Sequence, residues 1–395
     1  MRVIISNIHY LGLCLIILAC GEREAGVPHD SDYEFLLVDS VSMEIPGTVN
    51  VNSICVKMYA QAGREYLFWE NRSRFGIELF DLTDQKYIRP ILFSREGPNG
   101  IPSISGGFSV LGFDSIFVSS YEVGKLHWFD SAGVLKEVLR HADTTLIFEN
   151  NAIGINSKFR SDLYRYKDKL ILPYSTANFP TMPSEETVHD MQVVKIYDLV
   201  EKTYDPSGLH FDYDIYDPLS LLLVPSHIMM EDRYYYQIAT QSAIRYTDDF
   251  ETKHKKEAKS RYHTEYVQTR KYADPFAFKL ADFSYRSLYG DPHREVIYRT
   301  VKLPAQDVKT ADSKKEFNDI YERISIMILN KELDVLGETL FEHSNYSWNE
   351  CFVGEKGFYI LRSPYHPGYS ESAITYDIYE WREKEGVENS SFYHQ

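Results

Sequence analysis

Apolar and polar residues alternate along most of this chain in short segments that turn residues separate, from about residue 33 onward. The clearest example combines the alternating segments 116–119, 125–130 and 134–139. They are joined by turns at 121–124 and 131–133, and the second turn has glycine at the position where a left-handed conformation is required. A period of two is typical of half-buried strands, so we expect a meander of three antiparallel strands here.

The same pattern recurs along the chain. Its other segments are 65–70 with 76–81 and 87–93, 169–174 with 193–198, 233–239 with 243–248, 324–330 with 335–336, and 357–362 with 373–377. The polar residues that end the middle segments are Asp81, Asp130, Asp198, Asp248, Asn330 and Asp377, spaced by 49, 68, 50, 82 and 47 residues. A carboxylate or amide at this place caps a hairpin turn with its side chain, which explains the residue type without any functional role.

Spacings near 50 residues fit four-stranded propeller blades, and the longer spacings fit blades that carry insertions. Six units therefore predict an all-β, six-bladed propeller over residues 33–385, followed by a tail at 386–395. The strand-like segment 32–45 lies outside the six units. We expect it to complete the last blade beside 373–381, because a closed ring leaves no free sheet edge. A two-sheet sandwich or two separate β domains is the alternative.

The insertions have their own signals. Residues 312–323 are highly charged and place Phe317, Ile320 and Tyr321 at helical offsets, so we expect a short surface helix there. The stretches 141–163 and 175–192 are expected to be long loops between blades. Loops of this length often carry function, and disordered connectors are an equal alternative.

Composition supports a folded, strand-rich protein. Of the 395 residues, 44% are hydrophobic and 25% are charged, which is ordinary for a globular chain and excludes wholesale disorder. Aromatic residues reach 14%, led by 31 tyrosines, and this favours strands. The formal net charge of −16 opposes contact with phosphate backbones, so we expect no nucleic-acid partner.

Residues 1–19 predict a lipoprotein signal peptide. Arg2 provides the positive start, and the apolar run at 11–19 is about half as long as the roughly 20 residues of a membrane-spanning helix. The sequence ILAC at 17–20 resembles a bacterial lipobox, in which Cys20 becomes a lipid thioether; Leu18 is bulkier than usual at its position.

The segment 20–32 is polar and lacks periodicity, so we expect a flexible tether that spans roughly 20 Å between the lipidated cysteine and the folded body. This interpretation makes the membrane a partner through the lipid anchor. It predicts an outer-membrane lipoprotein of the cell envelope that faces the periplasm or the exterior. An ordinary cleaved signal with a chance cysteine and a retained membrane helix are the alternatives.

Four passages together resemble a known family. They are EYLFWEN at 65–71, REGPNGI at 95–101 followed by LGFDSIF at 111–117, LYGDPHREVIYR at 288–299 and ISIMILNKELDVLGETLF at 324–341. With the lipobox, they resemble a domain-of-unknown-function family of Gram-negative bacterial lipoproteins related to six-bladed, tolB-like or NHL-like propellers. The resemblance implies this fold and an envelope location. It implies no activity, substrate or catalytic residue.

Three loops carry candidate ligand-binding side chains. They are Arg95, Glu96, Asn99, His293, Arg294, Tyr365 and His366. The GPNG sequence at 97–100 could offer backbone amides to an anion, but it lacks the lysine of a phosphate loop, and a tight turn is the preferred interpretation. The loops at 291–294 and 363–369 combine imidazole and cationic or aromatic groups that can bind sugars or peptides. Amphipathic hairpin turns are the alternative.

No pattern in the chain predicts a metal, a cofactor or a catalytic nucleophile. The three carboxylates at 212–217 lack the glycine and distal glutamate of a calcium loop, so a solvated acidic turn is preferred. The 13 histidines form no HxH or HExxH spacing, and no CxxC pair accompanies them. The nucleophile-elbow spacing GxSxG is also missing.

Cys55 and Cys351 lie in strand-like segments of the first and last units, which a closed ring brings near each other. A disulfide forms only if their Cα atoms lie within about 7 Å. Two separate buried thiols is the commoner outcome.

These patterns favour a non-enzymatic binding or scaffold propeller at an envelope membrane, whose loops present a surface to an envelope protein, peptide or glycan. The alternative is an envelope hydrolase or lyase with carboxylates gathered around the propeller channel, which sequence spacing cannot reveal. Two carboxyl groups roughly 5 to 10 Å apart in a cleft would favour the enzyme. Sensory and purely structural roles complete the range of hypotheses.

Overall fold

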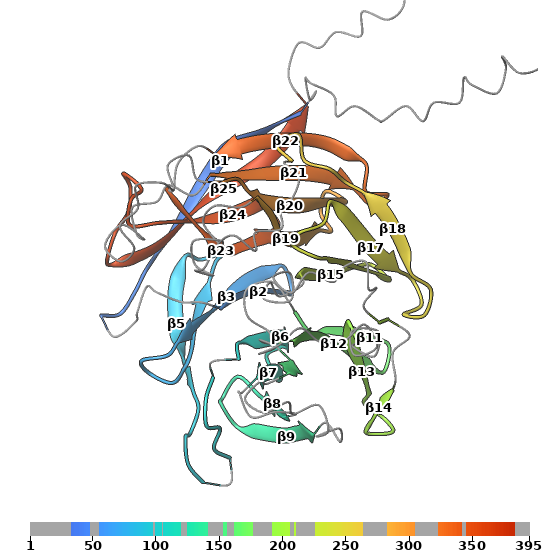
Figure 1. Ribbon diagram of the computed structural model, residues 1–395. Coiled ribbons are helices and arrows are strands. Elements are labelled where there is room, and N and C mark those ends of the chain that lie inside the picture. The colour runs from blue at the N-terminus through green and yellow to red at the C-terminus, as the bar shows by residue number, and fades with distance from the viewer. Residues whose placement is uncertain are drawn as a thin grey trace, which may run out of the picture.

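Six β-sheets surround a central axis in the computed structural model (Figure 1). The structure describes residues 33–47, 55–97, 99–104, 106–119, 125–140, 153–155, 162–176, 192–205, 209–210, 226–263, 283–304, 323–341 and 345–383. In Figure 1, strands β2, β6, β15, β19 and β23 lie toward the centre, and β5, β9, β18 and β22 lie toward the rim. The predicted all-β, six-bladed propeller is therefore confirmed, and the sandwich alternative is wrong.

Blades 1 to 3 occupy the first half of the chain. Blade 1 contains β2 (Val56–Gln61), β3 (Arg64–Asn71), β4 (Gly76–Asp81) and β5 (Lys86–Leu92). Blade 2 contains β6 (Phe108–Gly112), β7 (Ser115–Ser119), β8 (Lys125–Phe129) and β9 (Leu135–Arg140). Blade 3 contains β10 (Ile153–Ile155), β11 (Tyr164–Tyr166), β12 (Lys169–Thr176), β13 (Val194–Asp198) and β14 (Thr203–Asp205), with β10 and β11 both paired to β12.

Blades 4 to 6 complete the ring. Blade 4 contains β15 (Ser226–Met230), β16 (Arg233–Gln237), β17 (Ala243–Thr247) and β18 (His254–Glu257). Blade 5 contains β19 (Ser284–Asp291), β20 (Val296–Lys302), β21 (Ile324–Asn330) and β22 (Val335–Phe341). Blade 6 contains β23 (Tyr346–Gly354), β24 (Gly357–Arg362) and β25 (Ala373–Glu383), and its fourth strand is β1 (Tyr33–Glu44).

The N-terminal strand closes the ring, as predicted. β1 pairs antiparallel with β25 from Tyr33 opposite Glu383 to Glu44 opposite Ala373, with a register shift between Leu37 and Asp39. Because the outermost strand of blade 6 comes from the opposite end of the chain, the two ends of the fold are joined by a full ladder of backbone hydrogen bonds.

The described core consists of six clusters of buried side chains, and each one is shared by two neighbouring blades. Phe68 and Ile77 of blade 1, for example, pack with Phe108 and Phe129 of blade 2. The last cluster of the ring joins Tyr376 and its neighbours in blade 6 to strands β3 and β4 of blade 1. Both faces of each sheet are thus covered, which explains why most positions of the second and third strands are buried.

Four of the six aligned polar residues cap turns as predicted. Their side-chain oxygens accept backbone N–H groups two to four residues later, at Asp81, Asp130, Asp198 and Asn330. Asp248 and Asp377 do not follow the prediction. Asp248 pairs with Arg233 while Asp249 caps the turn, and Asp377 lies inside the long strand β25, where it accepts hydrogen bonds from Arg362.

The connections differ sharply between the two faces of the disc. Turns from a first to a second strand, or from a third to a fourth, contain at most six residues and define the tight-turn face. Because neighbouring strands are antiparallel, the other connections begin and end at the opposite, long-connection face. All connections of twelve or more residues begin and end at this face: 93–107, 141–152, 177–193, 206–225, 258–283 and 303–323.

The described residues contain no helix, and hence none that is apolar and long enough to cross a bilayer. The helix predicted at 312–323 lies outside the described residues, apart from Arg323, which directly precedes β21. The predicted loop 141–163 includes β10, and most of the predicted loop 175–192 is outside the described part of the chain.

Candidate functional site in the central channel

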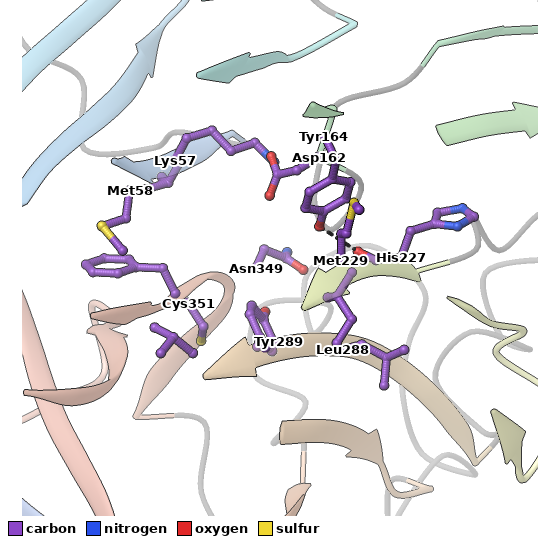
Figure 2. A pocket seen from close by; sticks show the side chains of 15 residues that line it. Lys57, Met58, Asp162, Tyr164, His227, Met229, Leu288, Tyr289, Asn349 and Cys351 are labelled. Carbon is purple, nitrogen blue, oxygen red and sulfur yellow. Dashed lines mark hydrogen bonds and ion pairs between the residues drawn. The ribbon is translucent and has the colours of Figure 1, made fainter. Parts of the chain in front are cut away.

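A cavity of about 220 Å³ lies on the propeller axis and is walled by the innermost strands of five blades (Figure 2). Its lining comes from β2, β15, β19, β23 and the segment that leads into β11. Charged and polar side chains in the lining are Lys57, Asp162, Tyr164, Tyr289 and Asn349. This volume is below the roughly 300 to 1,000 Å³ of drug-sized sites, so the cavity suits a small ligand.

A wide bulge in β23 shapes one wall of this cavity. Ser347 pairs with Leu361 and Phe352 pairs with Tyr359, so β23 has three more residues than β24 between these two pairs. The bulge exposes Asn349, which lies in the middle of the cavity view in Figure 2. Bulges commonly re-aim side chains beside functional sites, and here one brings an amide to the channel.

An ion pair crosses the channel wall from blade 1 to blade 3. The Lys57 Nζ lies 2.5 Å from Asp162 Oδ1, and the side-chain exposures are 8% for Lys57 and 43% for Asp162. Burial disfavours the charge on Lys57, but attraction to Asp162 outweighs it and raises the pKa of the lysine. The ammonium therefore stays charged, and the carboxylate is the member of the pair that a ligand in the cavity meets.

Tyr164 and His227 make the wall between blades 3 and 4. The Tyr164 hydroxyl donates to the His227 carbonyl oxygen at 3.2 Å, and burial raises the pKa of the phenol well above its ordinary value. The His227 ring points away from the cavity (Figure 2), and its Nδ1 lies 2.8 Å from the Tyr234 hydroxyl. Burial lowers the pKa of His227 to about 3, so this imidazole is neutral and serves the core rather than the channel.

The rest of the lining consists mainly of methionine and hydrocarbon side chains. Met58 and Met229 contribute thioethers, and Leu288, Phe352 and Val353 contribute hydrocarbon. A small number of polar groups on an apolar wall is the usual composition of a ligand site. The arrangement can hold a small molecule that has one polar end and one apolar end.

The described lining does not contain a catalytic pair of carboxylates, since Asp162 is its one acidic side chain. Nor do the described residues bring three or more histidine, cysteine or acidic side chains together as a metal site.

A family model for a domain of unknown function, DUF4221, matches residues 31–340. The chain belongs to the DUF4221 family. A crystal structure of a DUF4221 member from Bacteroides vulgatus is similar to it with a TM-score of 0.77 and 18% identity, covering 89% of this chain and 99% of that one. The predicted resemblance to a domain-of-unknown-function family with a six-bladed propeller fold is thus confirmed.

A second solved structure, a Bacteroides fragilis protein predicted to be exported, matches with a TM-score of 0.51 and 8% identity over 91% of this chain and 98% of that one. At these identities the two structures show the fold alone. No curated protein matches the chain at a significant level. Membership in DUF4221 therefore assigns no role to any residue of the channel.

The GPNG loop of this DUF4221 protein forms a tight turn. The Gly100 N–H donates to the Gly97 carbonyl at 3.0 Å, and the Ile101 N–H donates to the Ser94 carbonyl. Gly97 has a φ of 86°, and a Cβ at Gly100 would lie 2.8 Å from the Glu96 backbone, which explains both glycines. The amide of Gly100 is used inside the turn rather than offered to an anion.

The side chains predicted beside this turn are Arg95, Glu96 and Asn99, and none of them lines the channel cavity. The Arg95 guanidinium lies over the Phe75 ring, 4.4 Å from its centroid. These residues follow β5 and lie on the long-connection face. Their binding role stays a prediction.

His293 and Arg294 lie in the hairpin between β19 and β20, on the tight-turn face. Their backbone N–H groups donate to Asp291 Oδ1, each at 3.0 Å. The Arg294 side chain bonds to Asp291 Oδ2 and to the Glu355 carbonyl. These contacts give Arg294 a structural role that connects blades 5 and 6.

Tyr365 and His366 lie between β24 and β25, on the long-connection face. Tyr365 is 51% exposed. His366 Nδ1 accepts the Gly368 N–H, and its Nε2 lies 3.5 Å from Asp377 Oδ2. The predicted ligand residues are therefore divided between opposite faces of the disc and do not form one site.

A smaller cavity of about 110 Å³ lies under the loop that carries Tyr365 and His366. Its lining includes Ser363, Pro364, Tyr369 and Ser370 of this loop but not the two predicted residues. Glu350 from the β23 bulge also lines it, and its Oε2 accepts a hydrogen bond from Ser347. The bulge thus separates this cavity from the axial one.

Cys55 and Cys351 are separate buried thiols, so the disulfide considered between them is not present. They pack in different clusters, Cys55 between blades 1 and 2 and Cys351 between blades 5 and 6. Burial raises the pKa of Cys55 to about 12, which keeps that thiol protonated. Cys351, by contrast, lines the axial cavity.

Sequence reasoning missed the residues that form the channel site, namely Lys57, Asp162 and Asn349. Lys57 had one usable signal, because it is a charged residue between apolar neighbours in CVKM at 55–58. Asp162 and Asn349 had none, since their positions depend on a strand pairing and on a bulge.

Proposed function

We propose that this protein is a lipid-anchored binding propeller of the cell envelope, and that its ligand occupies the axial cavity. The observation that carries the proposal is the cavity itself, in which five blades bring an ion pair and an amide to an apolar pocket. Innermost strands far apart in the sequence converge there, as expected of a ligand site in a closed propeller.

The envelope location rests on the N-terminal sequence. A charged start, an apolar run and the ILAC sequence precede the polar segment 21–32, and β1 begins directly after it. A relative of the same fold from Bacteroides fragilis is predicted to be exported, which supports an extracytoplasmic location. A polar tether after a lipidated Cys20 would hold the disc near the membrane without inserting it.

The anchor is tested by growth of a Gram-negative host with labelled palmitate. We expect the full chain to take up label and to sediment with membranes. The Cys20→Ala variant is the matched control and is expected to remain unlabelled. Equal labelling of both chains, or a wild type without label, would remove the lipid anchor.

Cleavage of an envelope glycan or peptide, by a hydrolase or a lyase reaction, is the second candidate function. Catalysis of glycoside hydrolysis commonly needs two carboxyl groups on either side of the scissile bond. The described lining offers only Asp162, whose Oδ1 already accepts a hydrogen bond from Lys57. This arrangement favours binding over turnover.

Turnover is tested by incubating the purified full chain with envelope glycans and peptides and analysing products by mass spectrometry. We expect no product above the background of a heat-inactivated sample. Product formation that disappears in Asp162→Asn would replace the binding proposal with the enzymatic one. The exposed Asp205→Asn provides the control for loss of an acidic side chain elsewhere.

A further inference from the structure

We propose that the axial cavity takes a small organic cation, a primary alkylammonium in chemical class, at the carboxylate of Asp162. This inference rests on the proposed function, since it names the ligand class of the same cavity. The ion pair between Lys57 and Asp162, the unequal exposure of its two members and the apolar side chains of the lining each point to this class.

Among the described residues, only one side of the Asp162 carboxylate is used. Lys57 approaches Oδ1, and no other described residue bonds to the Asp162 side chain. An ionised carboxylate accepts hydrogen bonds at both oxygens, so Oδ2 can accept from a second donor. With 43% of its side chain exposed, Asp162 presents that capacity to the cavity.

The lysine is placed behind the carboxylate. Its side chain is 8% exposed, so a ligand reaches the ammonium far less readily than it reaches Asp162. An anionic ligand would meet the carboxylate first and be repelled. A cationic ligand would approach Oδ2 and make a charge-assisted hydrogen bond, which is roughly twice as strong as a neutral one.

The apolar part of the lining suits an alkyl group. Met58 and Met229 provide flexible, polarizable thioethers, and Leu288 and Phe352 provide apolar surface. A volume of about 220 Å³ limits the ligand to a short chain. The formal charge of −16 also draws cations to the molecule as a whole.

The test is isothermal titration of the full, detergent-solubilised chain with three probes of one size: n-butylammonium, 1-butanol and butyrate. We expect butylammonium to bind at least about tenfold more tightly than either of the others, a difference of about 1.4 kcal/mol. Butyrate or butanol binding as tightly as butylammonium would overturn the proposal without any variant.

Variants then locate the site. Asp162→Asn is expected to weaken butylammonium binding at least about tenfold, and Lys57→Met is expected to strengthen it, because a competing cation is removed. Asp205→Asn is the matched control: Asp205 also lies 2.5 Å from a lysine, Lys169, and its side chain is 42% exposed. Binding that survives Asp162→Asn, or that falls equally in Asp205→Asn, contradicts the assignment.

The two proposals can fail separately. If no ammonium probe binds, but an envelope molecule occupies the cavity and is excluded by a bulky side chain at Asn349, the ligand class is wrong and the channel site stands. If butylammonium binds and Asp162→Asn leaves it unchanged, the cation site lies elsewhere.

Discussion

Arg299 connects blades 4 and 5 through contacts that no local pattern in the sequence predicts. Its guanidinium donates to the backbone carbonyls of Gln241, Ser242 and Ala258 and to Gln237 Oε1, and it lies 3.5 Å from the Tyr285 ring centroid. Burial lowers the pKa of this guanidinium to about 9. Arg299 is fully buried, so its guanidinium and the four acceptor oxygens lose their hydrogen bonds to water on folding. The hydrogen bonds between them compensate for this loss.

His227 makes stability depend on pH. Its folded-state pKa of about 3 lies below the ordinary value of 6.5 because the ring is buried. The unfolded chain therefore binds more protons between these pH values, and the free energy of unfolding falls as pH is lowered from 6.5 toward 3. The slope from one such group is at most about 1.4 kcal/mol per pH unit. Above pH 6.5 the group adds no pH dependence.

We expect His227→Gln to flatten this slope, measured as denaturant midpoints from pH 7 to pH 4. His254→Gln, which removes an exposed histidine from β18 of the same blade, is the control for loss of a histidine side chain. An equal slope in wild type and His227→Gln would show that other groups dominate acid sensitivity.

In blades 1, 2, 3, 4 and 6 the sequence predicted the second and third strands, with β5, β9 and β1 in addition. In blade 5 it predicted the third and fourth strands, β21 and β22. β4 is buried at every position and β21 at all but its last, so their apolar runs are strong signals. The innermost strands were largely missed. β2 and β15, for example, are short and face the channel on one side, so their pattern of burial is irregular and resembles no simple template.

β1 is the element on which closure depends. Phe35 of this strand is buried, stacks on Tyr379 with centroids 5.3 Å apart, and meets Tyr298 of blade 5 edge to face. The ring thus closes through side-chain packing as well as through the backbone ladder with β25.

Phe35→Ala should lower the free energy of unfolding by about 3 to 5 kcal/mol, because it leaves a cavity between blades 5 and 6. Leu37→Ala in the same strand is the control. Leu37 is 55% exposed, so the expected change is within about 0.5 kcal/mol. Guanidinium denaturation of the two variants measures both values, and equal losses would contradict the role assigned to Phe35.

At the scale of the molecule, the number of blades could be predicted because each blade repeats one pattern of alternating segments with an aligned polar residue, which caps a turn in four of the six blades. The functional centre could not. Lys57, Asp162 and Asn349 are far apart in the chain, and only ring closure and the β23 bulge bring them to one cavity. The predicted loops lie instead on two opposite faces, where their side chains hold turns and neighbouring blades.

The two faces of the propeller differ in the length of their connections. All described turns on one face are short, while every connection of twelve or more residues begins and ends on the other. The N-terminal end of β1, where the proposed tether would attach, lies on the tight-turn face, because β1 runs as the fourth strand of blade 6 toward the long connections. An anchored disc would thus present its long-connection face away from the membrane.

Native mass spectrometry of the purified full chain, after incubation with the small-molecule fraction of an envelope extract, tests the channel site most directly. Asn349→Trp fills the cavity from an exposed position, and Val134→Trp adds the same side chain to a turn outside it, where Val134 is 52% exposed. The account predicts a bound small molecule on wild type and Val134→Trp and none on Asn349→Trp. A wild type that binds nothing, or an Asn349→Trp chain that binds as wild type does, would contradict it.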